Sequence, residues 1–184
     1  MIFNQRGYMT TSMNDIIKET GIQKGGIYRH FKDKDQLMIE AFQFSVQIMQ
    51  QHFVSMVEPC KNTKEKLNVF VEAFFDLSRN KPIVGGCPIF NAATEMDDLE
   101  GNTLIDYIDQ AMDELKALLS NIIHKGLQSK ELKEVVNPDE ASIFIISTLE
   151  GALILYKLKK DEQIITSVHH HLNHYFSTIF YERQ

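Results

Sequence analysis

The sequence predicts an all-α fold, and three observations support this prediction. Glycine and proline, the residues that most often interrupt helices, number only 9 and 4 among 184 residues. Apolar residues recur at helical spacing through most of the chain, most regularly over residues 103–128. Signals that start a helix precede these apolar stretches, and Asn137-Pro138-Asp139-Glu140 is the clearest of them. With 43% hydrophobic residues, the chain can bury a sizeable core.

The amino-terminal part, residues 11–37, predicts two short helices joined by a tight turn and followed by the start of a third helix. Thr11 and Ser12 are both residue types that cap a helix, so either one can begin the first helix. Gly21 is expected to end that helix because glycine readily adopts the left-handed conformation. Ile22 is expected to be the apolar plug of the turn.

The second short helix is expected to run from about residue 23 or 24 to Phe31, with Ile27 and Phe31 on its buried side. Its other face offers cationic and aromatic side chains beside a glycine, namely Lys24, Gly25, Tyr28, Arg29 and His30. A short helix with an apolar back and such tips has the shape that enters the major groove of DNA. The sequence therefore predicts a helix-turn-helix, and the alternative is that these groups form a solvated helix face.

Six further helices are predicted, over about residues 33–58, 62–78, 88–96, 103–128, 137–159 and 161–180. The first of them is expected to end before Pro59, because proline disfavours a helical residue in front of it. Residues 41–57 lack charge, but Gln, Ser and His interrupt them, so a buried helix is favoured over a membrane span.

Charge is distributed unevenly along the chain. Residues 1–34 hold six basic and three acidic residues, a net +3, so the remainder carries −9 to reach the total of −6. A basic end on an acidic body is typical of a protein that touches phosphate with one end only, and chance clustering is the alternative. The two cysteines make no disulfide framework and no secretory leader follows Met1, which predicts a cytoplasmic location.

The run GYMTTSMNDIIKETGIQKGGIYRHFKDKDQL, residues 7–37, closely resembles the DNA-binding signature of TetR-family transcriptional regulators. Its glycine-aromatic opening, capped helix, Gly-Ile turn, Lys-Gly-Gly-Ile-Tyr-x-x-Phe segment and following Lys-x-x-Leu are in register with that signature. Farther along, GGCPIFNAATEMDD and LEGALILYKLKKD look like the ligand-binding and dimerisation half of one TetR branch.

The resemblance implies an all-α homodimer of about nine helices per subunit, joined through the last two helices. Residues 1–42, the head, would form the helix-turn-helix DNA-binding domain, and residues 43–184, the body, the effector-binding and dimerisation domain. Only six residues precede Gly7, so we expect a truncated first helix, through either a misplaced start codon or a natural truncation.

The resemblance also implies which residues contact DNA. Thr11, Tyr28 and Lys34 match positions that hold phosphate groups, where hydroxyl and ammonium donors fix the register of the protein on the duplex. Glycine at other positions lets the backbone approach the base edges closely. The full set of DNA-contacting residues implied in this way is Thr11, Ser12, Lys24, Gly25, Gly26, Tyr28, Arg29, His30 and Lys34.

In the body, the resemblance implies a cavity for a small-molecule effector, although plain core is the alternative for any single residue. The candidate ligand-binding residues are Phe74, Phe75, Cys87, Phe90, Asn91, Glu95, Tyr107, Met112, Phe144 and Glu150. An unpaired buried carboxylate is costly, so Glu150 is expected to hydrogen-bond a ligand or a neighbouring chain, or to face water. Gly151 and Ala152 beside it suit a dimer seam, because small residues let helices approach closely.

Two further features have competing interpretations. Cys87 is expected at a helix start, where a lowered thiol pKa would make it a sensor thiolate, or else it is a small buried residue. His169, His170, His171 and His174 are interpreted as a solvated or interface face, because no Asp, Glu or Cys lies nearby at the spacing of metal ligands. The alternatives are a metal shared by His170 and His174, which are four residues apart, and a response to pH. Neither a metal nor a cofactor is expected.

The sequence thus predicts a DNA-binding transcriptional regulator, in the form of a ligand-responsive repressor that binds a palindromic operator as a homodimer. Its expected partners are double-stranded DNA, a small-molecule effector and a second copy of the chain, with no membrane. The alternative is a dimeric small-molecule-binding module whose DNA binding is impaired by its short amino terminus. An enzyme is not expected, because the sequence shows no nucleophile elbow, phosphate loop or paired metal-ligand motif.

Overall fold

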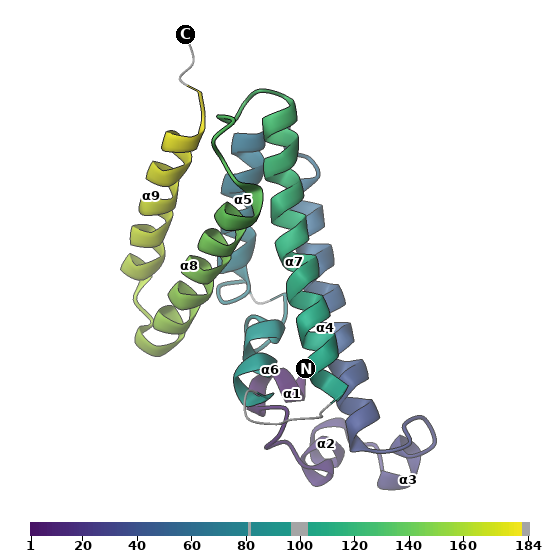
Figure 1. Ribbon diagram of the computed structural model, residues 1–184. Coiled ribbons are helices and arrows are strands. Elements are labelled where there is room, and N and C mark those ends of the chain that lie inside the picture. Colours follow the sequence, from purple (N-terminus) through teal and green to yellow (C-terminus); the bar gives the residue numbers. More distant parts are fainter. Residues whose placement is uncertain (81, 97–102, 182–184) are drawn as a thin grey trace.

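The computed structural model describes residues 1–80, 82–96 and 103–181, and within these ranges it contains nine α-helices and no β-strand (Figure 1). The all-α prediction is therefore confirmed. The helices are α1 (Ile2–Arg6), α2 (Met13–Thr20), α3 (Lys24–Ile27), α4 (Lys34–Val57), α5 (Thr63–Asp76), α6 (Pro88–Met96), α7 (Thr103–Gln128), α8 (Pro138–Lys159) and α9 (Glu162–Ile179).

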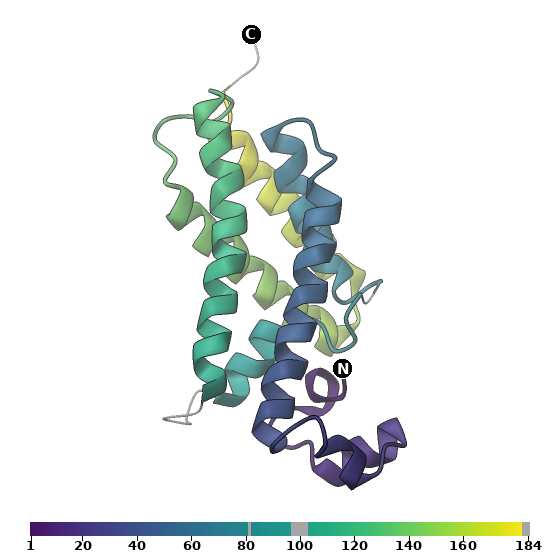
Figure 2. The same ribbon diagram turned by 90° about the vertical axis from the view of Figure 1, so that its right-hand side faces the viewer.

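The molecule is elongated, with its small helices gathered at one end. Helices α2 and α3 lie at one end of the long pair α4 and α7, α1 lies beside that end of α4 and next to α6, and α9 finishes near the opposite end (Figures 1 and 2). Helix α5 packs against α4, α7, α8 and α9, so it occupies the centre of the body. Helix α4 runs from the head into the body without a break, and the division at residue 42 stays a prediction.

The first helix of the motif, α2, begins and ends as its local signals direct. Of the two candidate caps, Ser12 is the one used, and it forms a reciprocal capping box with Asp15. Hydrogen bonds from Ser12 are the main cause that lowers the pKa of the Asp15 carboxyl. Gly21 ends the helix at φ 71° in the left-handed region, as predicted, and its N–H donates to the carbonyl of Ile17.

Two predictions for the turn and the second motif helix were wrong. Helix α3 ends at Ile27 instead of Phe31, and the next three residues form a turn. The adjacent glycines Gly25 and Gly26 explain this, because glycine is a poor helix former. Ile22 does not plug the turn, since half of its surface (51%) is exposed.

The longer helices agree with the predicted segments. Helix α4 ends at Val57, just before Pro59, and its buried face runs from Met38 to Val57. Helix α8 begins with Asn137, whose side chain accepts the N–H groups of Asp139 and Glu140. These matches arise because caps, prolines and periodic apolar residues act within a few residues of the element that they define.

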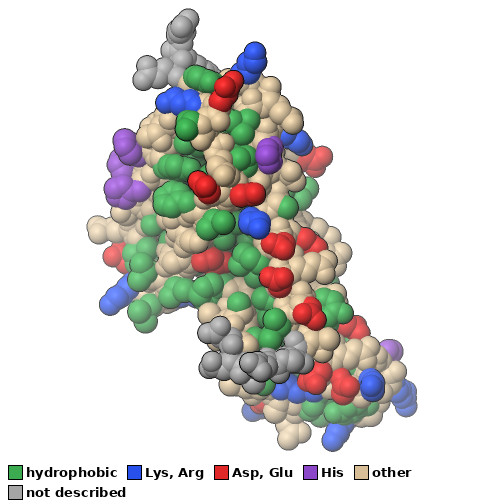
Figure 3. Space-filling view, in the orientation of Figure 1, with side chains coloured by type: hydrophobic (Ala, Val, Ile, Leu, Met, Phe, Trp, Pro, Cys, Tyr) green, Lys and Arg blue, Asp and Glu red, His purple; other side chains and the backbone are tan. Residues whose placement is uncertain are grey.

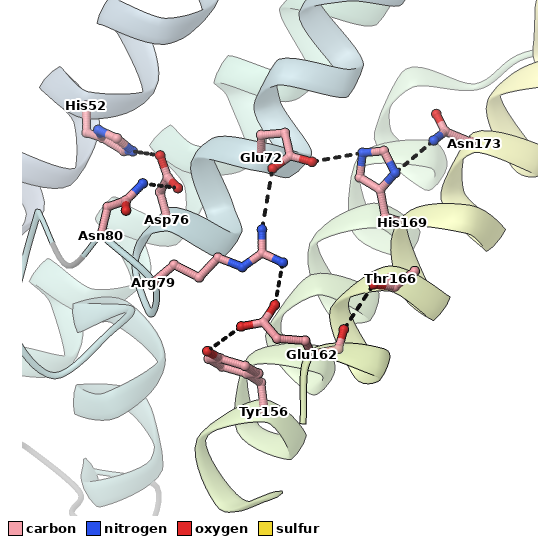
Figure 4. Close-up of polar contacts among 10 residues, drawn as sticks. All are labelled: His52, Glu72, Asp76, Arg79, Asn80, Tyr156, Glu162, Thr166, His169 and Asn173. Atoms are coloured by element: carbon pink, nitrogen blue, oxygen red, sulfur yellow. Dashed lines mark hydrogen bonds and ion pairs between the residues drawn. The ribbon is translucent and has the colours of Figure 1, made fainter. Parts of the chain in front are cut away.

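A polar network on the surface of the body joins α5 to α8 and α9 (Figure 4). Arg79, just after α5, contacts Glu162 at 2.6 Å and Glu72 at 3.8 Å. Glu72 also lies 3.0 Å from His169 of α9, and the hydroxyl of Tyr156 donates to Glu162 at 2.8 Å. Because these side chains are partly exposed, the network orients α9 more than it stabilises the fold.

Hydrogen bonds also attach the head to the body. Asn91 of α6 donates from Nδ2 to the backbone oxygen of Asn4 at 3.3 Å and to its Oδ1 at 3.0 Å. Asn4 in turn donates from Nδ2 to the carbonyls of Val84 at 2.9 Å and Gly86 at 3.0 Å. A Cβ on Gly85, which has φ +108°, would collide with the carbonyl of Asn4, so this close approach requires glycine.

A carboxylate and a pair of aromatic contacts complete this attachment. Glu95 of α6 accepts the backbone N–H of Tyr8 at 2.9 Å and that of Met9 at 3.0 Å. The ring of Tyr8 stacks on Phe3 at 5.9 Å and meets the edge of Phe42 at 6.0 Å. The contacts of Asn91 and Glu95 with residues 4–9 are called the head–body junction below.

Candidate DNA-binding surface and effector cavity

The outer face of α3 and the turn after it carries the predicted DNA-contacting side chains. Lys24, Tyr28, Arg29 and His30 are all exposed, while Ile27 on the opposite side is buried. Lys24 Nζ lies 5.7 Å from the centre of the Tyr28 ring, so these two groups support each other at the surface. Lys and Arg side chains gather on this end of the molecule (Figure 3).

The glycines of α3 differ in their surroundings. A Cβ on Gly25 would meet nothing within 4 Å, so the backbone there is open to an approaching duplex. A Cβ on Gly26 would lie 3.0 Å from the side chain of Ile22. Lys34, the first residue of α4, is half-buried and donates from Nζ to the carbonyl of Met9 at 3.3 Å. These placements bring Lys34 and the α3 surface to the same end of the molecule.

The side chains at the start of α2 are engaged within the protein. Thr11 is buried, and its hydroxyl donates to the carbonyl of Gly7. The predicted phosphate contact by the Thr11 side chain is therefore wrong in this structure, because the hydroxyl satisfies a backbone group instead. Ser12 is exposed, but its hydroxyl forms the capping box with Asp15.

A cavity of about 530 Å³ opens between α6, α7 and α8, which is within the range of small-molecule sites. Three of the predicted ligand-binding residues line it: Phe90, Met112 and Glu150. The sequence analysis missed the other lining residues, which are Lys116, Ile143, Ile146, Ser147, Gly151 and Ile154. The spacing of three or four along α8 was the signal that could have identified several of them.

Three of the predicted aromatic residues lie elsewhere in the body. Phe74 and Phe75 are fully buried, because the face of α5 that carries them packs against neighbouring helices. Tyr107 lines a separate shallow pocket between α4 and α7, since five residues along α7 place it on a different face from Met112. The structure therefore does not bring these three residues to the cavity between α6, α7 and α8.

The remaining predicted ligand-binding residues are also outside the cavity. Phe144 is half-exposed on α8 and packs edge-on against Tyr175 at 4.9 Å. Asn91 and Glu95 belong to the head–body junction, where backbone groups of residues 4–9 occupy their polar atoms. Among the described residues, no group of three or more His, Cys, Asp or Glu side chains could hold a metal ion.

Glu150 is the one carboxyl among the described residues that line the cavity. It is 6% exposed, so it does not face water, and burial raises its pKa to about 7. A hydrogen bond from the Cys87 thiol and the ammonium of Lys157 both act in the opposite direction. Within the described part of the chain, Oε1 of Glu150 has no hydrogen-bond partner.

Cys87 does precede α6, as expected, but it is not a reactive thiolate. It is buried, and burial together with the neighbouring Glu150 raises the pKa of the thiol well above its ordinary value. Desolvation therefore outweighs the effect of the helix start, and the thiol stays protonated at neutral pH. The alternative interpretation, a small buried residue, describes it correctly.

Lys157 connects the cavity region with the head–body junction. Its Nζ donates to Oδ1 of Asn91 at 3.1 Å, and burial lowers the pKa of this half-buried ammonium. On α6, Phe90 lines the cavity while the next residue, Asn91, binds the head. Two adjacent residues of one helix thus touch the candidate effector site and the candidate DNA-binding domain.

Comparison with known proteins agrees with this architecture. Residues 1–41 match the family described as "Bacterial regulatory proteins, tetR family", and residues 63–172 match "Tetracyclin repressor-like, C-terminal domain". The two matched parts are the head with its helix-turn-helix and most of the helical body. The chain belongs to the TetR family of helix-turn-helix transcriptional regulators.

Individual relatives are similar over most of their length. The HTH-type transcriptional regulator LmrA of Bacillus subtilis (strain 168) is 27% identical over 162 residues, which cover 87% of this chain and 82% of LmrA. A TetR transcriptional regulator from Chloroflexus aurantiacus has a TM-score of 0.90 at 31% identity, covering 97% of this chain and 89% of that one. A TetR-family regulator from Cytophaga hutchinsonii gives 0.91 at 27% identity, with 99% and 90% covered.

The raised pKa of Glu150 predicts how stability depends on pH. In the unfolded chain this carboxyl ionises near its ordinary pKa of 4.5, whereas in the folded protein it ionises near 7. Between these values the folded state holds a proton that the unfolded state has lost, so stability falls as pH rises through this window. The total loss is at most about 3 kcal/mol.

Urea unfolding at a series of pH values measures this effect. Glu150→Gln removes the titrating group. The unfolding free energy of this variant should therefore increase relative to that of the wild type as pH rises from 4.5 to 7. Glu134→Gln, on the exposed loop before α8, removes the same charge and should keep the wild-type slope. If Glu150→Gln keeps that slope as well, the buried carboxyl does not titrate as described.

Proposed function

We propose that the protein is a ligand-responsive repressor that binds a palindromic operator as a homodimer. The observation that carries this proposal is the outward presentation of Lys24, Tyr28 and Arg29 on an apolar-backed helix and the turn that follows it, at a basic end of an acidic molecule. Two such helices, related by a two-fold axis and one helical turn apart, would enter successive major grooves. A dimer bound to DNA in this way in the cytoplasm would block access to the promoter.

The apolar outer face of α8 supports the homodimer. Its exposed side carries Phe144, Ile154, Leu155 and Leu158, which are between 42% and 72% exposed. By length and composition alone α8 could cross a membrane, yet in this fold it packs against α7 and α9 on one side. A continuous exposed apolar stripe of this kind favours a second protein surface, and a two-fold axis lets the same face cover itself.

The ligand response is supported by α6, which lines the cavity with Phe90 and holds the head with Asn91. A ligand that moves α6 by a small amount would shift the contact with Asn4, and with it the angle of the head. In a dimer, this movement would change the distance between the two α3 helices. Affinity for DNA and for the effector would then be linked, each altering the other by the same factor.

We expect different effects from different DNA-contacting side chains. Tyr28→Ala and Lys34→Ala should each weaken binding to all DNA sequences, because each removes a phosphate contact. Lys34→Ala also removes a cation, so it should reduce the salt slope of the affinity by about 1, whereas the uncharged Tyr28 should leave the slope unchanged. Lys24→Ala should also change the base preference. Fluorescence anisotropy on the DNA upstream of the chain's own gene, at several salt concentrations, measures both quantities.

Lys64→Ala is the matched control for these variants, because Lys64 is an exposed lysine on α5 in the body. It should bind DNA as the wild type does. If the wild type fails to shift this DNA at low salt, the repressor proposal is wrong and a dimeric ligand-binding module takes its place.

The proposed dimer makes its own prediction. Leu155→Glu and Leu158→Glu place a charge within the exposed stripe of α8, and each should convert the dimer to a monomer, because an unpaired buried charge is costly. Sedimentation velocity measures the change. Val135→Glu, at a loop residue that is 88% exposed, should stay dimeric. A wild-type monomer, or dimers of both leucine variants, would exclude this interface.

A further inference from the structure

We propose that the cavity between α6, α7 and α8 selects a lipophilic organic amine, whose protonated nitrogen pairs with the carboxyl of Glu150. This inference deepens the proposed function and rests on it in one respect, namely that the bound amine acts as the effector. The binding preference itself is a property of the cavity and can be measured without DNA.

The first support is the unsatisfied acceptor in the cavity wall. Glu150 is more than nine-tenths buried, and its Oε1 has no hydrogen-bond partner in the part of the chain that the structure describes. The thiol of Cys87 donates a hydrogen bond to this same carboxyl group. Buried polar atoms are nearly always hydrogen-bonded, and a free acceptor that lines a cavity indicates a ligand with a donor.

The second support is the apolar character of most of the other lining residues, with Lys116 and Ser147 as the exceptions. Phe90, Met112, Ile146 and Ile154 offer no hydrogen-bonding side chain, and the cavity of about 530 Å³ can hold a hydrocarbon body. Because Lys116 is paired with Asp113, Glu150 is the charged group that would orient the cationic end of a ligand. Burial of the hydrocarbon would supply most of the affinity, and the carboxyl would supply the choice of head group.

The charges around Glu150 favour a cationic ligand over an anionic one. The ammonium of Lys157 faces Glu150 from the same helix but is bound to Asn91, and the thiol of Cys87 stays neutral. Lys116 of α7 lies at the cavity edge and is paired with Asp113 at 3.2 Å. A protonated amine would therefore supply the positive counter-charge that the buried carboxylate of Glu150 lacks, whereas a carboxylate ligand would be repelled by the negative charge of Glu150.

Three compounds that differ only in head group test the proposal: decylamine, decan-1-ol and decanoate. Isothermal titration of the full chain at about pH 7 should show decylamine binding at least about tenfold more tightly than decanoate, with the alcohol between them. Binding of the amine should also release protons, because the ion pair lowers the pKa of Glu150. Titrations in buffers of different ionisation enthalpy measure this release.

Glu150→Gln keeps the shape of the side chain and removes its charge. We expect this variant to lose about tenfold in affinity for decylamine, to lose the proton release, and to bind the three compounds with similar affinity. Glu134→Gln, on the exposed loop, should bind as the wild type does. The wild-type comparison stands by itself, so the test does not depend on the folding of the variant.

Three results would each overturn the inference. The first is that decanoate or the alcohol binds as tightly as the amine, and the second is that none of the three compounds binds. The third is that Glu150→Gln keeps the preference of the wild type for the amine. Its failure is distinct from failure of the proposed function. A protein that prefers the amine but does not bind DNA would keep this inference and lose the repressor. A protein that binds DNA but does not prefer the amine would keep the repressor proposal and lose this inference.

Discussion

The head of the protein keeps its place because two side chains of α6 hydrogen-bond to α1 and to the turn that follows it. Asn91 binds Asn4 through both the backbone oxygen and the side chain, and Glu95 accepts two successive backbone N–H groups. A domain of about forty residues rarely buries enough apolar surface to be stable alone. The head therefore depends on the head–body junction for its place on the body.

This constraint explains why the body can affect DNA binding at all. Helix α6 is short and lies between the cavity and the head, with Phe90 on one side and Asn91 on the other. Helix α8 likewise serves two surfaces, because Glu150 faces the cavity while Leu155 and Leu158 lie on its exposed stripe. A ligand in the cavity would thus contact the helices that set both the angle of the head and the spacing between subunits.

The sequence was sufficient for features that neighbouring residues determine. Ser12 as a cap, Gly21 as a helix end, the start of α8 at Asn137 and the periodic α7 were all readable from local patterns. The helix-turn-helix was recognisable for the same reason. The length of α3 was overestimated because its apolar spacing continues past the point where two glycines weaken the helix.

Features that depend on contacts between distant segments could not be read in this way. The partner of Asn91 lies 87 residues away, so its role in the junction left no local signal, and the same holds for Glu95. Thr11 was assigned to phosphate by its position in the motif, and the burial of its side chain was not visible in the sequence. For Cys87, the helix start was visible in the sequence but the burial that raises its pKa was not.

A double-mutant cycle between Asn4 and Asn91 tests the head–body junction most directly. The unfolding free energy in urea is measured for the wild type, Asn4→Ala, Asn91→Ala and the double variant. If these side chains bind each other as described, the two losses are non-additive, with a coupling energy of about 1 kcal/mol. Losses that add to within about 0.3 kcal/mol would show that the two residues act independently, which contradicts the account.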